Sequence, residues 1–302
     1  KNKFLERLQD NRIWFGEDGD GVPRIKRFLS ELKHDGLTPT SILFYKDVGH
    51  SQEGAKEVTQ LFDAGVFDGP KPVRLLTRLL TLANLKQDSI VLDFFSGSAA
   101  TAHALMRRNA EDGGHRKFIM VQLPEATDED GTAYKAGYEN ICEIGKERIR
   151  RAGTKIAAAA GEKAAGLDLG FRCLRLDTSN MTDVYYAPDA VTQDGLFAQV
   201  DNVKPDRTPE DLLFQTMLDL GILLSSSIVV EEIAGKRVFN VADGFLLACF
   251  DHDVTDEVVT AIAKRKPYYA VFRDASMADD SALTNFDQLF AAYSPATVRR
   301  VL

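Results

Sequence analysis

Long apolar runs are missing from this sequence of 302 residues. Its longest apolar stretches, such as residues 245–250, are far short of the roughly 20 residues that a membrane-spanning helix needs. No basic segment followed by an apolar one opens the chain. We therefore expect a cytoplasmic protein that makes no membrane contact.

Cysteine pairs and histidine clusters are also missing. Cys142, Cys173 and Cys249 are far apart and form no C-x-x-C pair, and the five histidines have no metal-ligand spacing. We therefore expect no disulfide and no metal site. Free cysteine is usually a small buried apolar residue, and we expect this for all three.

The sequence has no initiating Met and begins Lys1-Asn2-Lys3-Phe4-Leu5, which reads as a helix already under way. We therefore expect it to be part of a longer protein. With 44% hydrophobic and 27% charged residues, the chain has enough material for two domains with their own cores.

Basic residues are scarce in the C-terminal third. Residues 183–302 hold 10 Lys and Arg against 19 Asp and Glu, whereas the whole chain has a formal net charge of −8. Nucleic-acid binding draws most of its affinity from cations that neutralise phosphates. The acidic third is therefore a poor candidate for contact with DNA.

The patterning changes along the chain. Residues 1–66 mix short elements, including a strand at 12–15, an acidic glycine-rich turn at 16–21 and a helix from Pro23 to Leu32 with one basic face. From residue 67 onward, helices and strands alternate, as in a parallel sheet covered by helices. The predicted helices are 73–85, 101–109 and 138–151, and the predicted strands are 89–95, 117–122 and 171–176.

The apolar run at 89–95 is typical of a buried strand in a parallel sheet. After Pro188 a second, smaller α/β unit is predicted from helices at 210–220 and 256–264 and strands at 237–241, 245–251 and 268–272. We therefore expect an α/β fold with segments 1–66, 67–187 and 188–302.

The most informative segment is residues 91–104, which read as a strand, a tight turn of small residues and a helix start. Gly97 lets the backbone approach a ligand closely, and the helix start offers free N–H groups, so the turn could hold an adenosine-bearing cofactor. The G-x-G-x-x-G spacing that holds a pyrophosphate is absent, and Asp93 would repel one. S-adenosylmethionine is cationic and has no phosphate, so an acid there is favourable.

The stretch Asp93 to Thr101 resembles motif I of the β class of DNA amino-methyltransferases, and Gly69-Pro70-Lys71-Pro72-Val73 resembles motif X. Motif X before motif I, with a helix between them, indicates the permuted arrangement in which the catalytic and target-recognition segments precede the cofactor half. Further stretches are similar to the modification subunit of type III restriction-modification systems: 12–16, 22–29, 47–53, 145–151 and 213–221. This resemblance implies a partial Rossmann-like methyltransferase sheet.

The resemblance also implies roles for individual residues. The implied S-adenosylmethionine-binding residues are Lys71, Pro72, Asp93, Phe94, Phe95, Gly97, Ser98, Thr101 and Gln122. Gln122 stands where many relatives have an acid that binds the ribose hydroxyls, and an amide can still accept one hydrogen bond and donate another. Ala99 and Ala100 depart from the family's Gly and Thr. If residue 99 needs a positive φ, Ala is worse than Gly there by on the order of 1 kcal/mol.

The Asp/Asn-Pro-Pro-Tyr string with which such enzymes hold the flipped adenine is missing, because none of the ten prolines neighbours another. We therefore expect no catalytic residue here and no methyl transfer by these residues alone. The resemblance implies DNA contact through the full-length protein, a restriction subunit as partner and a homodimer. The sheet should run from 171–176 through 117–122 to 89–95, with 89–95 at its open side. Two alternatives remain, an assembly module that has lost the cofactor and a nucleotide-dependent oxidoreductase.

Overall fold

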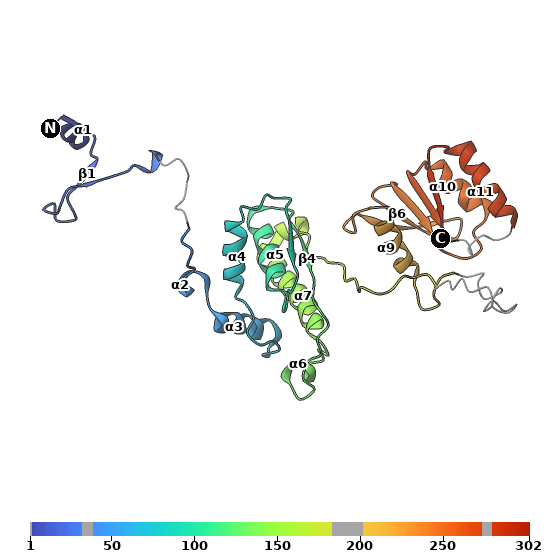
Figure 1. The fold of residues 1–302 in the computed structure, drawn as a ribbon, viewed down its shortest axis with the longest axis horizontal. Coiled ribbons are helices and arrows are strands. Elements are labelled where there is room, and N and C mark those ends of the chain that lie inside the picture. Colours follow the sequence, from blue (N-terminus) through green and yellow to red (C-terminus); the bar gives the residue numbers. More distant parts are fainter. Residues whose placement is uncertain (1, 32–38, 183–201, 274–279) are drawn as a thin grey trace, which may run out of the picture. The chain divides into compact units, whose positions relative to one another are not determined.

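The computed structural model describes residues 2–31, 39–182, 202–273 and 280–302, and these form two compact units, Lys1–Cys173 and Leu174–Leu302 (Figure 1). The predicted boundary between residues 187 and 188 lies outside the described residues, so the three-segment division stays a prediction. No helix in the described part of the chain is long and apolar enough to cross a membrane.

The first unit begins with α1 (Asn2–Gln9), followed by a two-stranded hairpin of β1 (Ile13–Trp14) and β2 (Arg24–Ile25) and the short 3-10 helix η1 (Leu29–Glu31). The helix predicted from Pro23 is therefore wrong. Ile25 lies opposite Ile13 in an antiparallel pair, because the glycine-rich turn at 16–21 brings the chain back along β1. β-branched residues favour such pairing over a helix. Leu32 lies outside the described residues.

The sheet of this unit has two parallel strands, β3 (Ile90–Asp93) and β4 (Lys117–Met120), paired in register from Ile90 opposite Lys117 to Asp93 opposite Met120. Its helices are α2 (Tyr45–Val48), α3 (Ser51–Phe62), α4 (Val73–Leu82), α5 (Ala100–Asp112), α6 (Thr132–Lys135), α7 (Ile141–Ala160) and the 3-10 helix η2 (Gly161–Gly166). The predicted order of helix, strand, turn, helix, strand and long helix is confirmed for 73–151.

Helices cover one face of this sheet. Phe118 and Met120 of β4 pack against a cluster that contains Met106 of α5 and Ile149 of α7, and Val91 packs against a second cluster that contains Leu105 of α5. The described residues of this unit leave the other face uncovered: Ile90 is 59% exposed, and Leu92 and Ile119 are also exposed. The prediction that 89–95 is a buried strand is therefore wrong for Ile90 and Leu92. Among the described strands β3 pairs only with β4, as expected for a strand at the open side of the sheet.

The third predicted strand, 171–176, is also wrong, since the structure has no strand there. Leu169 and Phe171 pack against the cluster of α5 and α7, while Leu174 and Leu176 are exposed. The apolar residues at the start of this segment thus contact helices rather than extending the sheet past β4.

The second unit is a five-stranded sheet in the order β5 (Ile228–Ile233), β6 (Lys236–Val241), β7 (Leu246–Cys249), β8 (Tyr269–Phe272) and β9 (Val298–Val301). The first three strands are antiparallel, and β7, β8 and β9 are mutually parallel. Two separate apolar clusters pack on it, one with α9 (Pro209–Asp219) and the other with α10 (Asp256–Lys264) and α11 (Asp280–Tyr293). The prediction of a smaller α/β unit is confirmed.

Burial of the cysteines differs from one to the next: Cys249 is buried, Cys142 is partly buried and Cys173 is exposed. The expectation of a buried cysteine is therefore wrong for Cys173, which follows the last residues that pack on α5 and α7. No group of three or more His, Cys, Asp or Glu side chains in the described residues is placed to hold a metal ion.

Candidate functional site

The turn between β3 and α5 is held closed by the end of β4. Ser96 donates its backbone N–H to the Val121 carbonyl at 3.2 Å, and Gly97 donates its N–H to Gln122 Oε1 at 2.7 Å. Gly97 has a φ of +50°, and a Cβ on it would lie 3.1 Å from Phe67 Cζ. Both the backbone conformation and the tight space beside Phe67 therefore favour glycine here.

Ala99 is the last residue before α5 and adopts the left-handed conformation, with φ 58° and ψ 37°. Residue 99 therefore does need a positive φ, and Ala is less favourable than Gly there by on the order of 1 kcal/mol. Gly145 of α7 lies against this turn, since a Cβ on it would be 3.3 Å from the Gly97 carbonyl oxygen and 3.7 Å from Ala99 Cβ.

Asp93 ends β3 and accepts a hydrogen bond from Thr101 Oγ1 to its Oδ2 at 2.6 Å. Thr101 is buried and Asp93 is partly buried, so the hydroxyl fixes the carboxylate at the base of the turn. The other oxygen, Oδ1, receives no hydrogen bond from the described residues. A directed carboxylate oxygen of this kind can bind a cationic group.

Gln122, two residues after the end of β4, uses its amide within the chain. Its Oε1 accepts from Gly97, and its Nε2 donates to the Leu123 carbonyl at 3.2 Å. Phe94 and Phe95 lie in the same turn but are 64% and 78% exposed, respectively. The turn therefore joins a fixed polar base to two exposed aromatic rings.

Lys71 and Pro72 precede α4, and Pro72 is the cap residue before Val73. Pro72 is buried and Lys71 is exposed. Helix α3 lies directly against this segment, because a Cβ on Gly54 would come within 2.1 Å of the Pro70 carbonyl oxygen.

Among the predicted site residues, hydrogen bonds join Asp93 to Thr101 and Gly97 to Gln122. Two residues that the sequence did not predict, Arg148 and Glu57, connect Ser98 to the start of α4. Ser98 is buried and accepts a hydrogen bond from Arg148 Nη1 at 2.7 Å. Arg148 Nη2 in turn lies 3.6 Å from Glu57 Oε2. A signal was available for Arg148, since it lies four residues after Ile144 and four before Ala152, on the buried face of α7.

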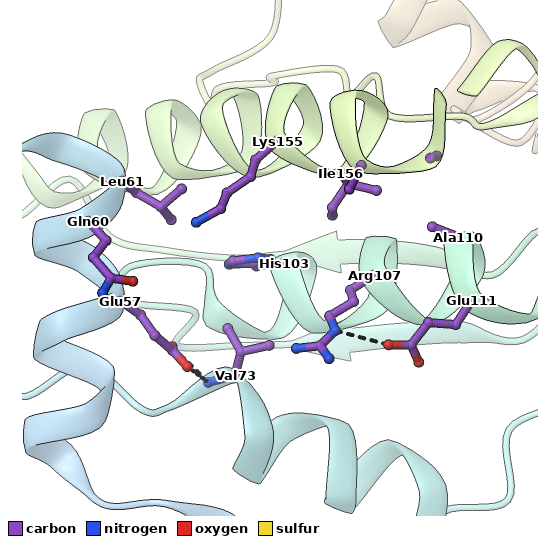
Figure 2. Close-up of a pocket in the computed structure, with 12 residues that line it drawn as sticks. Glu57, Gln60, Leu61, Val73, His103, Arg107, Ala110, Glu111, Lys155 and Ile156 are labelled. Atoms are coloured by element: carbon purple, nitrogen blue, oxygen red, sulfur yellow. Dashed lines mark hydrogen bonds and ion pairs between the residues drawn. The ribbon is translucent and has the colours of Figure 1, made fainter. Parts of the chain in front are cut away.

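A cavity of about 460 Å³ lies between α3, α5 and α7, with Glu57 among the residues that line it (Figure 2). Figure 2 shows His103 between Lys155 of α7 and Val73 at the start of α4. Burial, with additional repulsion from Arg148, Arg107 and Lys155, lowers the pKa of His103 to about 3. His103 is therefore neutral at neutral pH, and its Nδ1 has no hydrogen-bond partner among the described residues.

The stretch that contains this turn is similar to known proteins. Residues 10–150 match the N6_N4_Mtase family, described as DNA methylase. The chain is 41% identical over 175 residues to the type III restriction-modification enzyme StyLTI Mod subunit of Salmonella typhimurium. These 175 residues cover 58% of this chain and 26% of that protein. It is 38% identical over 159 residues to the EcoPI Mod subunit of Escherichia phage P1, covering 52% and 24%.

A relative of another type shares a similar stretch. The chain is 31% identical over 130 residues to the type II methyltransferase M.KpnI of Klebsiella pneumoniae, covering 43% of this chain and 30% of that protein. The aligned stretches thus amount to about a quarter of each of the two Mod subunits.

Proposed function

We propose that this chain is the cofactor-binding part of a DNA N6-adenine methyltransferase, because residues 10–150 match the DNA methylase family and the chain is similar to type III modification subunits. β3 and β4 would be two strands of a Rossmann-like methyltransferase sheet, and residues 67–187 would bind S-adenosylmethionine. The observation that carries this proposal is the closed turn at the end of β3, with its fixed Asp93 carboxylate.

The donor set of the turn fits S-adenosylmethionine. When bound, this cofactor supplies a methyl group activated by the positive charge on its sulfur. Asp93 would attract the cationic methionine portion through the oxygen that Thr101 leaves free. Gly97 and Ser98 would bring their backbone close to the ligand, because Gly97 has no side chain and its φ of +50° favours glycine.

Aromatic and basic groups would complete this pocket. Phe94 and Phe95, both exposed, would pack against the cofactor, which offers apolar ring surface to them. Lys71 and Pro72 would line the methionine end. These roles rest on the family resemblance and on the exposure of the side chains concerned.

Gln122 would both hold the turn and form hydrogen bonds with the ribose of S-adenosylmethionine. Its Oε1 has a second lone pair and its Nε2 a second N–H besides those used by Gly97 and Leu123, so it can still accept and donate. Two features favour the alternative of an assembly module that has lost the cofactor: the strained Ala99 and this internal use of the Gln122 amide.

DNA would be the substrate of the complete protein, and residues 1–302 alone would not methylate it, since the adenine-holding string is not in this sequence. Residues 188–302 would contact protein partners, namely a second copy or a restriction subunit. The acidic charge supports this, as does an aromatic cluster in which Phe245 stacks on the half-exposed Tyr268 at 5.0 Å. Tyr269 is partly covered, and Phe272 is fully buried in the core, so Phe272 offers no surface for contact.

Calorimetric titration of the chain with S-adenosylmethionine, its demethylated product and NAD tests the proposal. We expect saturable binding of the first two and no heat with NAD. Binding of NAD alone would favour the oxidoreductase alternative, and binding of none of the three would favour the assembly module.

A further inference from the structure

Arg148 is a fully buried cation in the middle of α7, with no exposed surface. Burial lowers its pKa to about 10, which still leaves it charged at neutral pH. Its Nε and Nη2 have no hydrogen-bond partner among the described residues. Such a buried charge stabilises the fold little, because the cost of its desolvation opposes the attraction to its partners.

The contacts of Arg148 join two segments that are far apart in the sequence. Nη1 donates to Ser98 Oγ at 2.7 Å, inside the turn between β3 and α5. Nη2 lies 3.6 Å from Glu57 Oε2 of α3. One planar guanidinium thus reaches both a hydroxyl and a carboxylate, which the single ammonium of lysine does not do with the same geometry.

Glu57 carries the link onward to the start of α4. Its carboxylate accepts the Val73 backbone N–H, at 3.2 Å through Oε1 and 2.9 Å through Oε2 (Figure 2). Val73 directly follows Lys71 and Pro72, so this bond fixes the exit of that segment. Gly54, one turn earlier in α3, lies close against Pro70 and so contacts the same segment.

From this chain of contacts we infer that Arg148 is a positioning residue, which sets the spacing between the β3–α5 turn and the Lys71–Pro72 segment through Ser98 and Glu57. The inference rests on the proposed function, in which these two segments hold opposite parts of one S-adenosylmethionine molecule. Arg148 does not touch the cofactor in this assignment, and the Ser98 hydroxyl is directed toward Arg148 rather than toward the ligand.

Arg148→Met tests this inference, because methionine keeps an unbranched apolar stem as far as the position of the arginine Nε and removes both polar contacts. Arg151→Met is the matched control: Arg151 lies on the same helix and also reaches α3, donating to the Leu61 carbonyl at 2.9 Å, but it does not contact the turn. Both variants of the full chain are first compared by thermal unfolding, so that binding is measured where each is folded.

In the ligand-free chain, hydrogen exchange followed by mass spectrometry gives a readout that needs no cofactor. We expect Arg148→Met to speed exchange in peptides containing residues 97–101 and Val73, and Arg151→Met to leave both unchanged. Titration with S-adenosylmethionine should then show affinity lowered by at least about tenfold in Arg148→Met and within about twofold of the parent in Arg151→Met.

Ser98→Ala covers the case in which Arg148→Met does not fold. It should speed exchange around residues 97–101 by itself, and it should add no further loss of affinity to Arg148→Met where that variant folds. Parent-like exchange at both segments in Arg148→Met, or an equal change in Arg151→Met, would overturn the inference. Absence of cofactor binding by the parent chain would instead refute the proposed function, and the exchange experiment would still decide the role of Arg148.

Discussion

His103 should make the first unit lose stability in mild acid. Burial, together with Arg148, Arg107 and Lys155, lowers its pKa from the ordinary value of 6.5 to about 3 in the folded chain. Below pH 6.5 the unfolded chain takes up a proton at His103 that the folded chain does not, so acid favours unfolding. Between pH 6.5 and about pH 5 the free energy of unfolding therefore falls by about 2 kcal/mol, at about 1.4 kcal/mol for each pH unit.

The measurement is urea unfolding followed by circular dichroism at about pH 7.5 and about pH 5, for the parent chain and for His103→Gln. Subtracting one protein from the other removes contributions that the two share. The ionisation of Glu57 is one of these contributions. Burial raises the pKa of Glu57, so its protonation increases the free energy of unfolding as the pH falls.

We expect the parent to lose about 2 kcal/mol more than His103→Gln on acidification. His115→Gln, which changes an exposed histidine of the same unit, should behave as the parent does. An equal loss in the parent and in His103→Gln would show that the imidazole accepts a proton without unfolding, and the argument from burial would fail.

Four further outcomes are expected. In titrations with S-adenosylmethionine, Asp93→Ala should abolish binding and Gln122→Ala should weaken it by about 1 to 2 kcal/mol, and equal, undetectable effects of both would contradict these roles. Ala99→Gly should relieve about 1 kcal/mol of backbone strain but lose about 0.8 kcal/mol from a buried methyl, so the urea midpoint should barely move, and a large loss would mean that the methyl packs more tightly than assumed. Incubation of residues 1–302 with DNA and radiolabelled cofactor should give no methyl incorporation, since the positioning of the flipped base should be worth several powers of ten in rate. Deleting residues 191–302 from the full-length protein should lower its sedimentation mass or abolish capture of the restriction subunit, whereas a steep fall in DNA affinity with sedimentation unchanged would mean that the charge argument was wrong.

Local signals made much of the first unit predictable. The apolar run at 90–93, the small residues before Ala100 and the second run at 117–120 specify strand, turn, helix and strand by composition alone. The α10 helix was predicted at its observed bounds for the same reason, since an acidic first turn precedes apolar residues at helical spacing.

The errors arose where the same residues suit two environments. Ile25 and its neighbours fit a helical face, but the preceding turn placed them beside β1. The apolar run of β3 predicts a strand with two apolar faces, and the described residues cover only the face that carries Val91. Composition specifies the surface that a strand offers and leaves open what packs on it.

The polar contacts of the site differ in how far they depend on tertiary packing, which explains why the motif revealed both ends of one contact and only one end of another. Asp93 and Thr101 are eight residues apart, within one strand–turn–helix unit, and both belong to the motif. Ser98 and Arg148 are 50 residues apart and meet where α7 packs against the turn, with Gly145 at the close approach. A charged residue on the apolar face of an amphipathic helix indicates that it has a buried partner, but only the packed structure identifies that partner. For Arg148 the partners belong to two other segments, and this is why replacing it should disturb the spacing of the site as well as the stability of the helix.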